Sequence, residues 1–476
     1  MTKPPALANG VRETLPQEVQ AYLRAVEVYL LAVETRLTEV EARLGASSQN
    51  SSRPPSSDPP GAPPRPQKQP RSARKRGGQK GHAGQHRALK ADQAVDAVVE
   101  HWPTHCPGCQ TALPPDAERV GEPLRQPVWE LPPLAPTVTE HQYHIVGCPA
   151  CQQCIRATRP ADVPSGAFGP RLVSLVALLN GRYRLSKREV GDLLAEVFAV
   201  SISDASVVRA CEHVSAALVT PYAEAQTVVE ASAHAHLDET GWKQAGQRRW
   251  LWVAVTTLCT LFRAATTRRR AELTALVGDA YGGRVTSDRF SAYAHLSVER
   301  RQVGWAHLKR DLLALGQGPY RTEAWAARAL RVEAQMFALW HRFRGGRIDR
   351  VSLLVFMQPL CDQFAALLTE GLTWPWSKVR GFCTELLKLE PALWTFVSVP
   401  GVEPTNNAAE RALRPAVLWR KGSFGSDSEG GLRFVERILT VTATCRQHSR
   451  PLLPFLTEAV SAHWAGHSAP SLFAVP

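Results

Sequence analysis

The chain has 476 residues and a formal net charge of +13, with 44% hydrophobic and 21% charged residues. That length allows several domains with at least one large core, and the positive charge favours an acidic partner. The N-terminal stretch MTKPPALANG lacks the apolar core of a signal peptide, and apolar runs such as residues 172–179 are too short to cross a bilayer. We therefore expect a soluble cytoplasmic protein with no membrane contact.

Residues 19–44 predict a coiled-coil helix. Apolar residues recur there at alternating spacings of four and three, the pattern of a coiled-coil seam: Val19, Leu23, Val26, Leu30, Val33, Leu37, Val40 and Leu44. The strict repeat favours self-association over a single helix packed on its own protein, and it leaves the number of strands open. We assign residues 1–45 to an oligomerisation helix and expect a homo-oligomer.

Residues 46–98 predict a disordered basic linker. Pro, Ser and Gly dominate the segment and no apolar period survives in it. Its densest positive charge lies in RSARKRGGQK, which offers candidate contacts to a phosphate backbone: Arg71, Arg74, Lys75, Arg76 and Lys80. An electrostatic arm for a polyanion is favoured over a merely solvated linker.

Residues 99–162 predict a zinc-binding ribbon. Cys106 and Cys109 form one CxxC pair, and Cys148 and Cys151 form another. Two such turns can direct four thiolates at one Zn²⁺ ion, in a closed structural site. Cys154 adds another thiol at the same spacing, which leaves the choice of the fourth ligand open.

Residues 163–228 predict a helical domain. The stretch at 185–214 contains two short helix patterns joined around AVSIS, with Ser203 or Asp204 as the N-cap of the second helix. A DNA-binding helix-turn-helix and an ordinary helical hairpin fit this pattern equally well.

Residues 229–425 predict an α/β domain. Three β-rich runs, a helix, and then alternating strand and helix follow one another, which is the order of a ribonuclease H-like fold. The first and fourth strands lie side by side in that fold. Asp238 near the end of the first strand and Asp288 at the end of the fourth are then neighbours, whereas His234 and His236 are expected to be structural.

Two neighbouring carboxylates repel each other, and a divalent cation such as Mg²⁺ or Mn²⁺ relieves the repulsion. Glu410, in EPTNNAAERALRP, is the candidate for a third carboxylate ligand. Asn406, Asn407 and Arg414 share its helical face and are candidates for positioning metal-bound water or a substrate phosphate. The plainer alternative is a helix start with a Glu410–Arg414 surface pair.

The stretches HLDETGW, SDRFSAY, GWAHLKRD and EPTNNAAERALRP resemble the insertion-sequence-sixty-six family of DDE transposases, over nearly the whole chain. The resemblance implies a triad of Asp238, Asp288 and Glu410, interrupted by a helical insertion at about residues 311–400. It also implies two-metal chemistry, in which an activated water cuts DNA at the element end and the freed 3′-hydroxyl attacks target DNA. His307 follows the fifth strand and is expected either near this site or as a core histidine.

The expected partners are element ends and target DNA, and accessory proteins of the same element are left open. A catalytically silent DNA-binding relative and a metal-dependent nuclease of the same fold are the alternatives to an active transposase. A glycosidase built on paired carboxylates would leave the basic arm and the CxxC pairs without a role. Residues 426–476 are expected to form a C-terminal helical segment.

Overall fold

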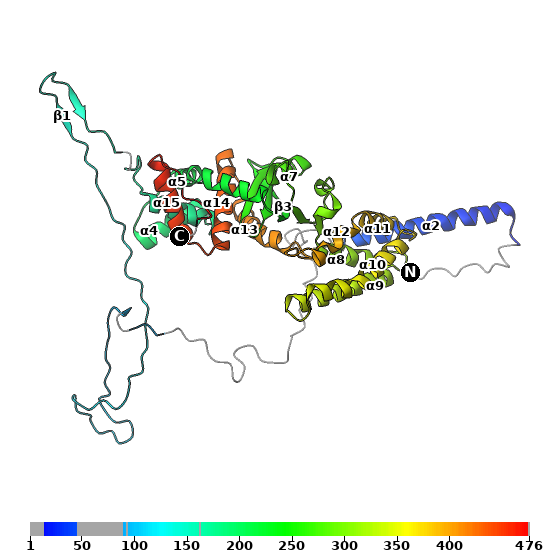
Figure 1. The fold of residues 1–476 in the computed structure, drawn as a ribbon, viewed down its shortest axis with the longest axis horizontal. Helices are drawn as coiled ribbons and strands as arrows, with labels where there is room; N and C mark the ends of the chain where they lie inside the picture. Colours follow the sequence, from blue (N-terminus) through cyan, green and yellow to red (C-terminus); the bar gives the residue numbers. More distant parts are fainter. Residues whose placement is uncertain (1–13, 45–88, 92–93, 161–162, 475–476) are drawn as a thin grey trace. The chain divides into compact units, whose positions relative to one another are not determined.

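The structure is a computed structural model that describes residues 14–44, 89–91, 94–160 and 163–474 (Figure 1). The chain divides into two compact units, of which residues 1–63, 139–196 and 200–476 form the first and residues 64–138 with 197–199 the second. The basic residues at 71–80 lie outside the described residues, as does most of the predicted linker.

The N-terminal helix α2 spans Gln17–Leu44 and contains the predicted heptad pattern. Several seam residues are exposed on the single chain: Val19, Leu30, Val33, Leu37 and Val40. A short hairpin follows later in the chain, made of β1 (Ile145–Gly147) and β2 (Cys154–Arg156), which pair antiparallel.

A helical body surrounds α5. Its members are α3 (Pro170–Gly181), α4 (Lys187–Phe198), α5 (Asp204–Ala217), α6 (Val219–Glu230), α14 (Glu429–Gln447) and α15 (Leu452–Trp464). Helix α5 packs against α3, α14 and α15, so the C-terminal segment shares a core with the predicted helical domain. The Ser203 side chain accepts a hydrogen bond from the Ser206 N–H, which confirms Ser203 as the N-cap of α5.

The central sheet has five strands in the order β5-β4-β3-β6-β7. They are β3 (His234–Gln244), β4 (Gln247–Val255), β5 (Thr260–Ala265), β6 (Arg284–Ser287) and β7 (Arg301–Val303). Strand β4 is antiparallel to both of its neighbours, β3 and β5, whereas β6 is parallel to both β3 and β7. Helix α7 (Arg270–Val277) and the short helices η3 (Ser291–Tyr293) and η4 (Val298–Arg300) complete this part of the chain.

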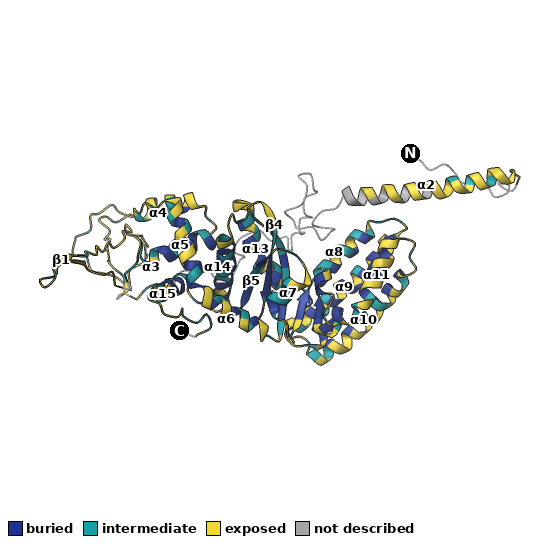
Figure 2. Cartoon of the chain, turned by 90° about the horizontal axis from the view of Figure 1, so that it is seen from above, coloured by how far each residue is buried: buried dark blue, intermediate teal, exposed yellow. Residues whose placement is uncertain are grey.

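The predicted neighbourhood of the first and fourth strands is confirmed. In the parallel register His234 pairs with Arg284 and His236 pairs with Thr286. The same offset places Asp238 and Asp288 at one level, at the carboxyl end of β6. Figure 2 shows that the strands around this point are largely buried.

Helix α14 covers the free edge of β5, with three side chains that each accept a hydrogen bond from the strand. Thr444 Oγ1 accepts from Thr260 N at 3.2 Å, Thr440 Oγ1 from Phe262 N at 2.9 Å, and Glu436 Oε1 from Ala264 N at 2.6 Å. The three acceptors recur one helical turn apart, so one face of α14 occupies the edge that another strand could otherwise extend.

Five helices lie between β7 and the helix that carries Glu410. They are α8 (Trp305–Gly316), α9 (Thr322–Arg344), α10 (Arg350–Gly371), α11 (Ser377–Lys388) and α12 (Glu390–Ser398). They enclose an aromatic core that includes Trp305, Trp325, Phe364, Trp394 and Phe396. The chain then enters α13 (Asn407–Ser423), which packs on β3 and β4.

One helix bears on the expectation that no segment spans a membrane, although length and composition alone are weak evidence for a span. Of the described residues, α10 forms a helix long and apolar enough to cross a bilayer by length and composition alone. Its Leu353, Met357, Phe364 and Leu368 are buried in the core of the helical segment. Because polar residues interrupt α10, a search for unbroken apolar runs passes over it.

Candidate active site

Asp238 lies in the middle of β3, which continues to Gln244, and this corrects its expected place near the end of the strand; Asp288 directly follows β6 at the same level. Asp238 Oδ1 accepts a hydrogen bond from the Glu239 N–H at 2.9 Å, and Asp288 Oδ1 accepts one from the Phe290 N–H at 2.9 Å. Burial, and then the negative charges of Glu239 and Asp288, raise the pKa of Asp238 well above its ordinary value. Two acidic side chains therefore share one poorly solvated space, as the sequence predicts.

Glu410 lies in the first turn of α13 and its side chain is partly exposed. Its carboxylate is 3.8 Å from His307 Nε2 and 3.6 Å from Arg310 Nη2. The pair with Arg414, which belonged to the plainer alternative, is not among the ion pairs of Glu410 in the described part of the chain; both observed partners come from α8. The charge of Glu410 also raises the pKa of Asp238, as the smallest of the contributions.

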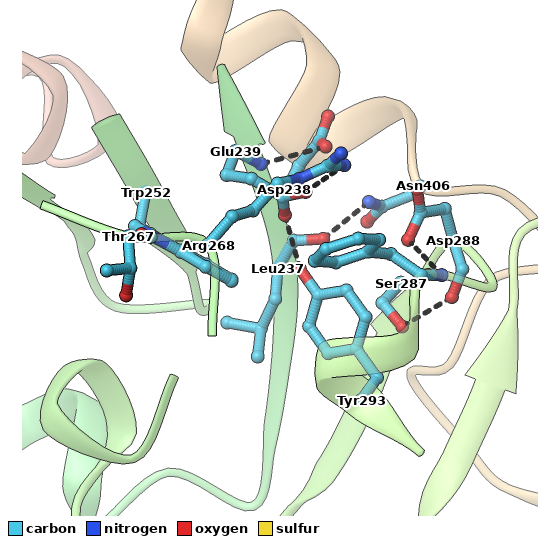
Figure 3. A network of polar contacts seen from close by, with 11 residues as sticks. Leu237, Asp238, Glu239, Trp252, Thr267, Arg268, Ser287, Asp288, Tyr293 and Asn406 are labelled. Atoms are coloured by element: carbon cyan, nitrogen blue, oxygen red, sulfur yellow. Dashed lines mark hydrogen bonds and ion pairs between the residues drawn. The ribbon is translucent and has the colours of Figure 1, made fainter. Parts of the chain in front are cut away.

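Asn406 holds the start of α13 against β3 (Figure 3). It is 1% exposed, its Nδ2 donates to the Leu237 carbonyl at 2.7 Å, and its Oδ1 is 3.3 Å from His236 Nδ1. Both ends of its amide are thus engaged inside the protein, which corrects the expectation that Asn406 reaches water or phosphate. Asn407, the next residue, is exposed.

The two histidines of β3 occupy structural positions. His234 Nε2 lies 2.8 Å from Thr286 Oγ1, and burial lowers the pKa of His234 to about 4. Burial also lowers the pKa of His236, which contacts Asn406. Both rings are therefore neutral links between β3 and its neighbours.

His307 lies in the first turn of α8, close to the carboxylates. Gly304, just before this helix, donates its N–H to the Ser287 carbonyl at 2.9 Å and so brings α8 against the end of β6. Burial, followed by the charge of Arg310, lowers the pKa of His307. Its Nδ1 is buried without a hydrogen-bond partner, so His307 has one polar atom that the protein leaves unsatisfied.

The donor atoms suit a hard divalent cation, because all three candidate ligands are carboxylates and the buried one is destabilised by its neighbours. Across the described ranges, however, no three His, Cys, Asp or Glu side chains are gathered closely enough to form a metal site. The arrangement therefore provides the Asp238–Asp288 pair, with Glu410 held to one side by Arg310 and His307.

Sequence reasoning missed a second polar network, which uses Glu239. The Glu239 side chain is fully buried, pairs with Arg268 and accepts a hydrogen bond from Tyr293 Oη at 2.8 Å. The Arg268 guanidinium lies 3.7 Å from the centre of the Phe290 ring. Because Phe290 donates its N–H to Asp288, the network ties the Asp288 loop to β3 (Figure 3). Strand alternation contained the signal, since it places Glu239 on the buried Leu237 face, where a carboxylate needs partners.

The CxxC pair at Cys106 is a tight turn inside a hairpin. Cys106 N donates to the Thr111 carbonyl at 2.9 Å, and Gln110 N donates to the Cys106 carbonyl at 2.8 Å. Gln110 takes a left-handed conformation, with φ of 59°. Hydrogen bonds from the Thr111 hydroxyl and backbone lower the pKa of Cys109, which favours the thiolate that a metal needs.

The CxxC pair at Cys148 repeats this turn, at the tip of the β1–β2 hairpin. Cys148 N donates to the Gln153 carbonyl at 2.8 Å, and Gln152, with φ of 59°, donates to the Cys148 carbonyl at 2.8 Å. Backbone N–H groups of Cys151 and Ala150 lower the pKa of Cys148. Both turns therefore fit as zinc knuckles, each presenting two thiols.

The equivalence of the two turns bears on Cys154. The hydrogen bonds of the two turns correspond, so Cys106 is equivalent to Cys148 and Cys109 to Cys151. In the same alignment the position equivalent to Cys154 is Ala112, which is not a metal ligand. Cys154 lies in β2, paired with Gly147, beyond the turn itself.

Comparisons with known proteins agree with these features. A family model described as "Transposase IS66 family" matches residues 165–433, and one described as "zinc-finger binding domain of transposase IS66" matches residues 103–152. A family of unknown function, DUF6444, matches residues 3–88. A stretch of 200 residues is 27% identical to "Uncharacterized protein y4qI" of Sinorhizobium fredii, which is 38% of this chain and 36% of that protein. The match thus spans about a third of that relative, whose name states no activity.

Proposed function

The chain belongs to the IS66 family of transposases, and on that premise we propose that it cleaves the ends of a DNA element and joins the freed 3′-hydroxyl to target DNA. The sheet order β5-β4-β3-β6-β7 supports a ribonuclease H-like catalytic core, because the β5–β4 and β4–β3 pairs are antiparallel and the β3–β6 and β6–β7 pairs are parallel. The observation that carries the proposal is the meeting of Asp238 and Asp288 on parallel neighbouring strands, next to the α13 turn that carries Glu410.

Mg²⁺ or Mn²⁺ would be held by Asp238, Asp288 and Glu410 and would supply the activation of water or a 3′-hydroxyl that phosphodiester chemistry requires. The protein sets the positions of these ligands. Asn406 fixes the start of α13 to the residue before Asp238, and the Glu239–Arg268 network fixes the loop that follows Asp288.

Through Arg310 and His307, the position of the Glu410 carboxylate would depend on whether DNA is bound. They hold the Glu410 carboxylate while no DNA is present, and a DNA phosphate competes with that carboxylate for Arg310. When Arg310 binds phosphate, Glu410 is released to face Asp238. Arg414 and Asn407 are exposed on α13 and remain candidates for contacts with the substrate backbone.

The remaining regions would organise the DNA. The zinc-finger match supports Zn²⁺, for which Cys106, Cys109, Cys148 and Cys151 are the proposed ligands. The basic residues at 71–80 would bind DNA phosphates, and α2 would pair with other copies of the chain through its exposed seam. The protein would work in the bacterial cytoplasm at the nucleoid, with or without accessory proteins of the element.

The domain assignment stays as predicted from the sequence. It comprises an oligomerisation helix (1–45), a basic linker (46–98), a zinc ribbon (99–162), a helical DNA-binding domain (163–228), a catalytic domain with a helical insertion at about 311–400 (229–425) and a C-terminal helical segment (426–476).

Cleavage and joining of a duplex that carries the element's terminal sequence test the proposal. Asp238→Asn and Glu410→Gln are expected to abolish both reactions while DNA binding persists, whereas Asp279→Asn, at an exposed carboxylate after α7, leaves them intact. Cleavage without joined products would favour a nuclease. DNA binding without cleavage by the unaltered protein would favour a silent relative.

A further inference from the structure

Helix α13 presents a cationic stripe that starts beside Glu410. Arg411, Arg414 and Lys421 are exposed and recur at helical spacings that keep them on one face of the helix. Arg420 is turned inward, where its guanidinium donates to the Gly241 carbonyl. The exposed stripe therefore offers three cations in a row, which is a surface for a phosphate backbone.

The stripe ends at an aromatic residue in an unusual backbone conformation. Phe424 caps α13 with φ of 61°, in the left-handed region, and donates its N–H to the Arg420 carbonyl at 2.9 Å. Glycine usually takes this position because a β-carbon is disfavoured there. An apolar residue at such a cap normally packs back onto its helix, yet Phe424 is 77% exposed. The strained backbone thus presents an aromatic ring to solvent.

The loop that holds Phe424 is fixed to the tip of the β3–β4 hairpin. Ser426 N donates to the Lys243 carbonyl at 2.9 Å, and Ala245 N donates to the Ser426 carbonyl at 2.8 Å. A β-carbon at Gly425 would lie 2.4 Å from the Lys243 carbonyl oxygen, so the loop approaches the hairpin more closely than another residue would allow. These contacts therefore fix the backbone of the loop that carries Phe424.

The charges around Phe424 suit a polyanion. Lys243 and Arg248 are exposed on the hairpin, and Lys421 is exposed on the last turn of α13. Glu429, an acidic residue of the following segment, is paired with Arg433 at 2.9 Å. Arg248 also lies over the Trp250 ring at 4.7 Å, and Asp427 is an exposed acidic residue of the same loop, so exposed cations outnumber exposed carboxylates near Phe424. An exposed aromatic ring with cations nearby is the combination that binds nucleic acid by stacking on bases and contacting phosphates.

We infer that Phe424 stacks on, and unstacks, one base of the element-end DNA whose backbone follows the exposed face of α13. The inference rests on the proposed function, because it takes Glu410 as the position of the cleaved phosphate. Fourteen residues separate Glu410 from Phe424, which is about 21 Å along a helix axis. At about 3.4 Å per nucleotide, the unstacked base lies about six nucleotides from the cleaved bond.

The test uses the full-length protein with the Asp238→Asn change, so that the DNA stays intact. The DNA probe is an element-end duplex with 2-aminopurine, whose fluorescence rises on unstacking, placed singly at successive positions. We expect a maximum about six nucleotides from the cleaved bond, its loss in Phe424→Ala, and its retention in Phe424→Trp. Cleavage by otherwise unaltered Phe424→Ala is expected to slow by about fivefold to a hundredfold, the range of base–aromatic stacking.

Two further variants separate stacking from folding. Phe424→Gly removes the ring and suits the left-handed backbone, so we expect a Tm no lower than that of the unaltered protein together with loss of the fluorescence maximum. Leu258→Ala, at another exposed apolar residue, is expected to change neither the Tm nor the fluorescence maximum.

An unchanged fluorescence maximum in Phe424→Ala overturns the inference. It is also overturned if Phe424→Ala loses self-association and the unaltered protein unstacks no base, because the ring would then contact another protein chain. If the unaltered protein binds and cuts the duplex without unstacking a base, this inference fails and the proposed function stands. If the unaltered protein neither binds nor cuts the duplex, both fail.

Discussion

Alanine substitution of Asn406 is expected to destabilise the protein, whereas the same change at its neighbour Asn407 is not. The Asn406→Ala change removes both amide contacts and leaves the Leu237 carbonyl and His236 Nδ1 buried without that partner. Each buried polar group left unpaired costs about 1–3 kcal/mol. Because the His236 contact, at 3.3 Å, is long for a hydrogen bond, we expect a total loss of about 2–4 kcal/mol in the free energy of unfolding.

Thermal unfolding measures this loss. At about 2–4 °C per kcal/mol for a domain of this size, Tm is expected to fall by about 4–16 °C. The matched control is Asn407→Ala, at the exposed neighbour, which is expected to stay within about 0.5 kcal/mol of the unaltered protein. Equal Tm values for the two variants would refute the assigned role of Asn406.

The same pair of variants tests the link to catalysis. Asn406 occupies the N-cap position of α13, whose first turn carries Glu410, and its side chain ties that turn to Leu237, so its loss removes the fixed base from which Glu410 would reach Asp238. At a temperature where both variants are folded, we expect Asn406→Ala to cleave roughly a hundredfold more slowly, the cost of a small misplacement of a reacting group. Full activity in folded Asn406→Ala would show that Glu410 does not depend on this contact.

Three other regions of the molecule give predictions. Arg268→Met leaves the buried Glu239 carboxylate without its cation and is expected to lower the free energy of unfolding by about 3 kcal/mol. Glu239→Gln is expected to cost less, because the Arg268 side chain that it leaves unpaired is one-third exposed to water. A larger loss for Glu239→Gln in chemical denaturation would contradict this. Burial raises the pKa of Glu436 from 4.5 to about 7, so its contribution to stability is present below 4.5 and is lost as pH rises through 7. Between about pH 5 and about pH 8, Glu436→Gln should therefore flatten the fall in Tm, and an unchanged slope would argue against it. Zinc content should be lost in Cys109→Ser and kept in Cys154→Ser, and zinc loss in the latter would make Cys154 a ligand.

Local patterns predicted the succession of strands and helices, and the ribonuclease H-like fold that this order indicates then predicted that the two aspartates are neighbours. The alternation in β3 placed Asp238 on a defined face, and the strand before Asp288 was recognisable from its own residues. Parallel pairing then follows from the order of the elements, and the observed register agrees with it. The CxxC turns were equally local, because their geometry depends on six consecutive residues.

The roles of Asn406 and Glu239 could not be predicted in the same way. Asn406 is buried because of Leu237 and His236, which are about 170 residues away, so nothing in the pair Asn406–Asn407 tells which member points inward. Glu410 likewise had a plausible partner one turn along its own helix, but α8 brings Arg310 closer. Contacts between distant segments decide these cases, and helical periodicity contains no information about them.

The most direct test of the metal-dependent account is an anomalous-diffraction map of crystals soaked in Mn²⁺, collected for the protein alone and for its complex with element-end DNA. The account predicts an ion between Asp238 and Asp288 in the complex, with the Glu410 carboxylate turned from Arg310 toward it. A DNA complex with no ion at the aspartates, and with Glu410 still paired to Arg310, would contradict it.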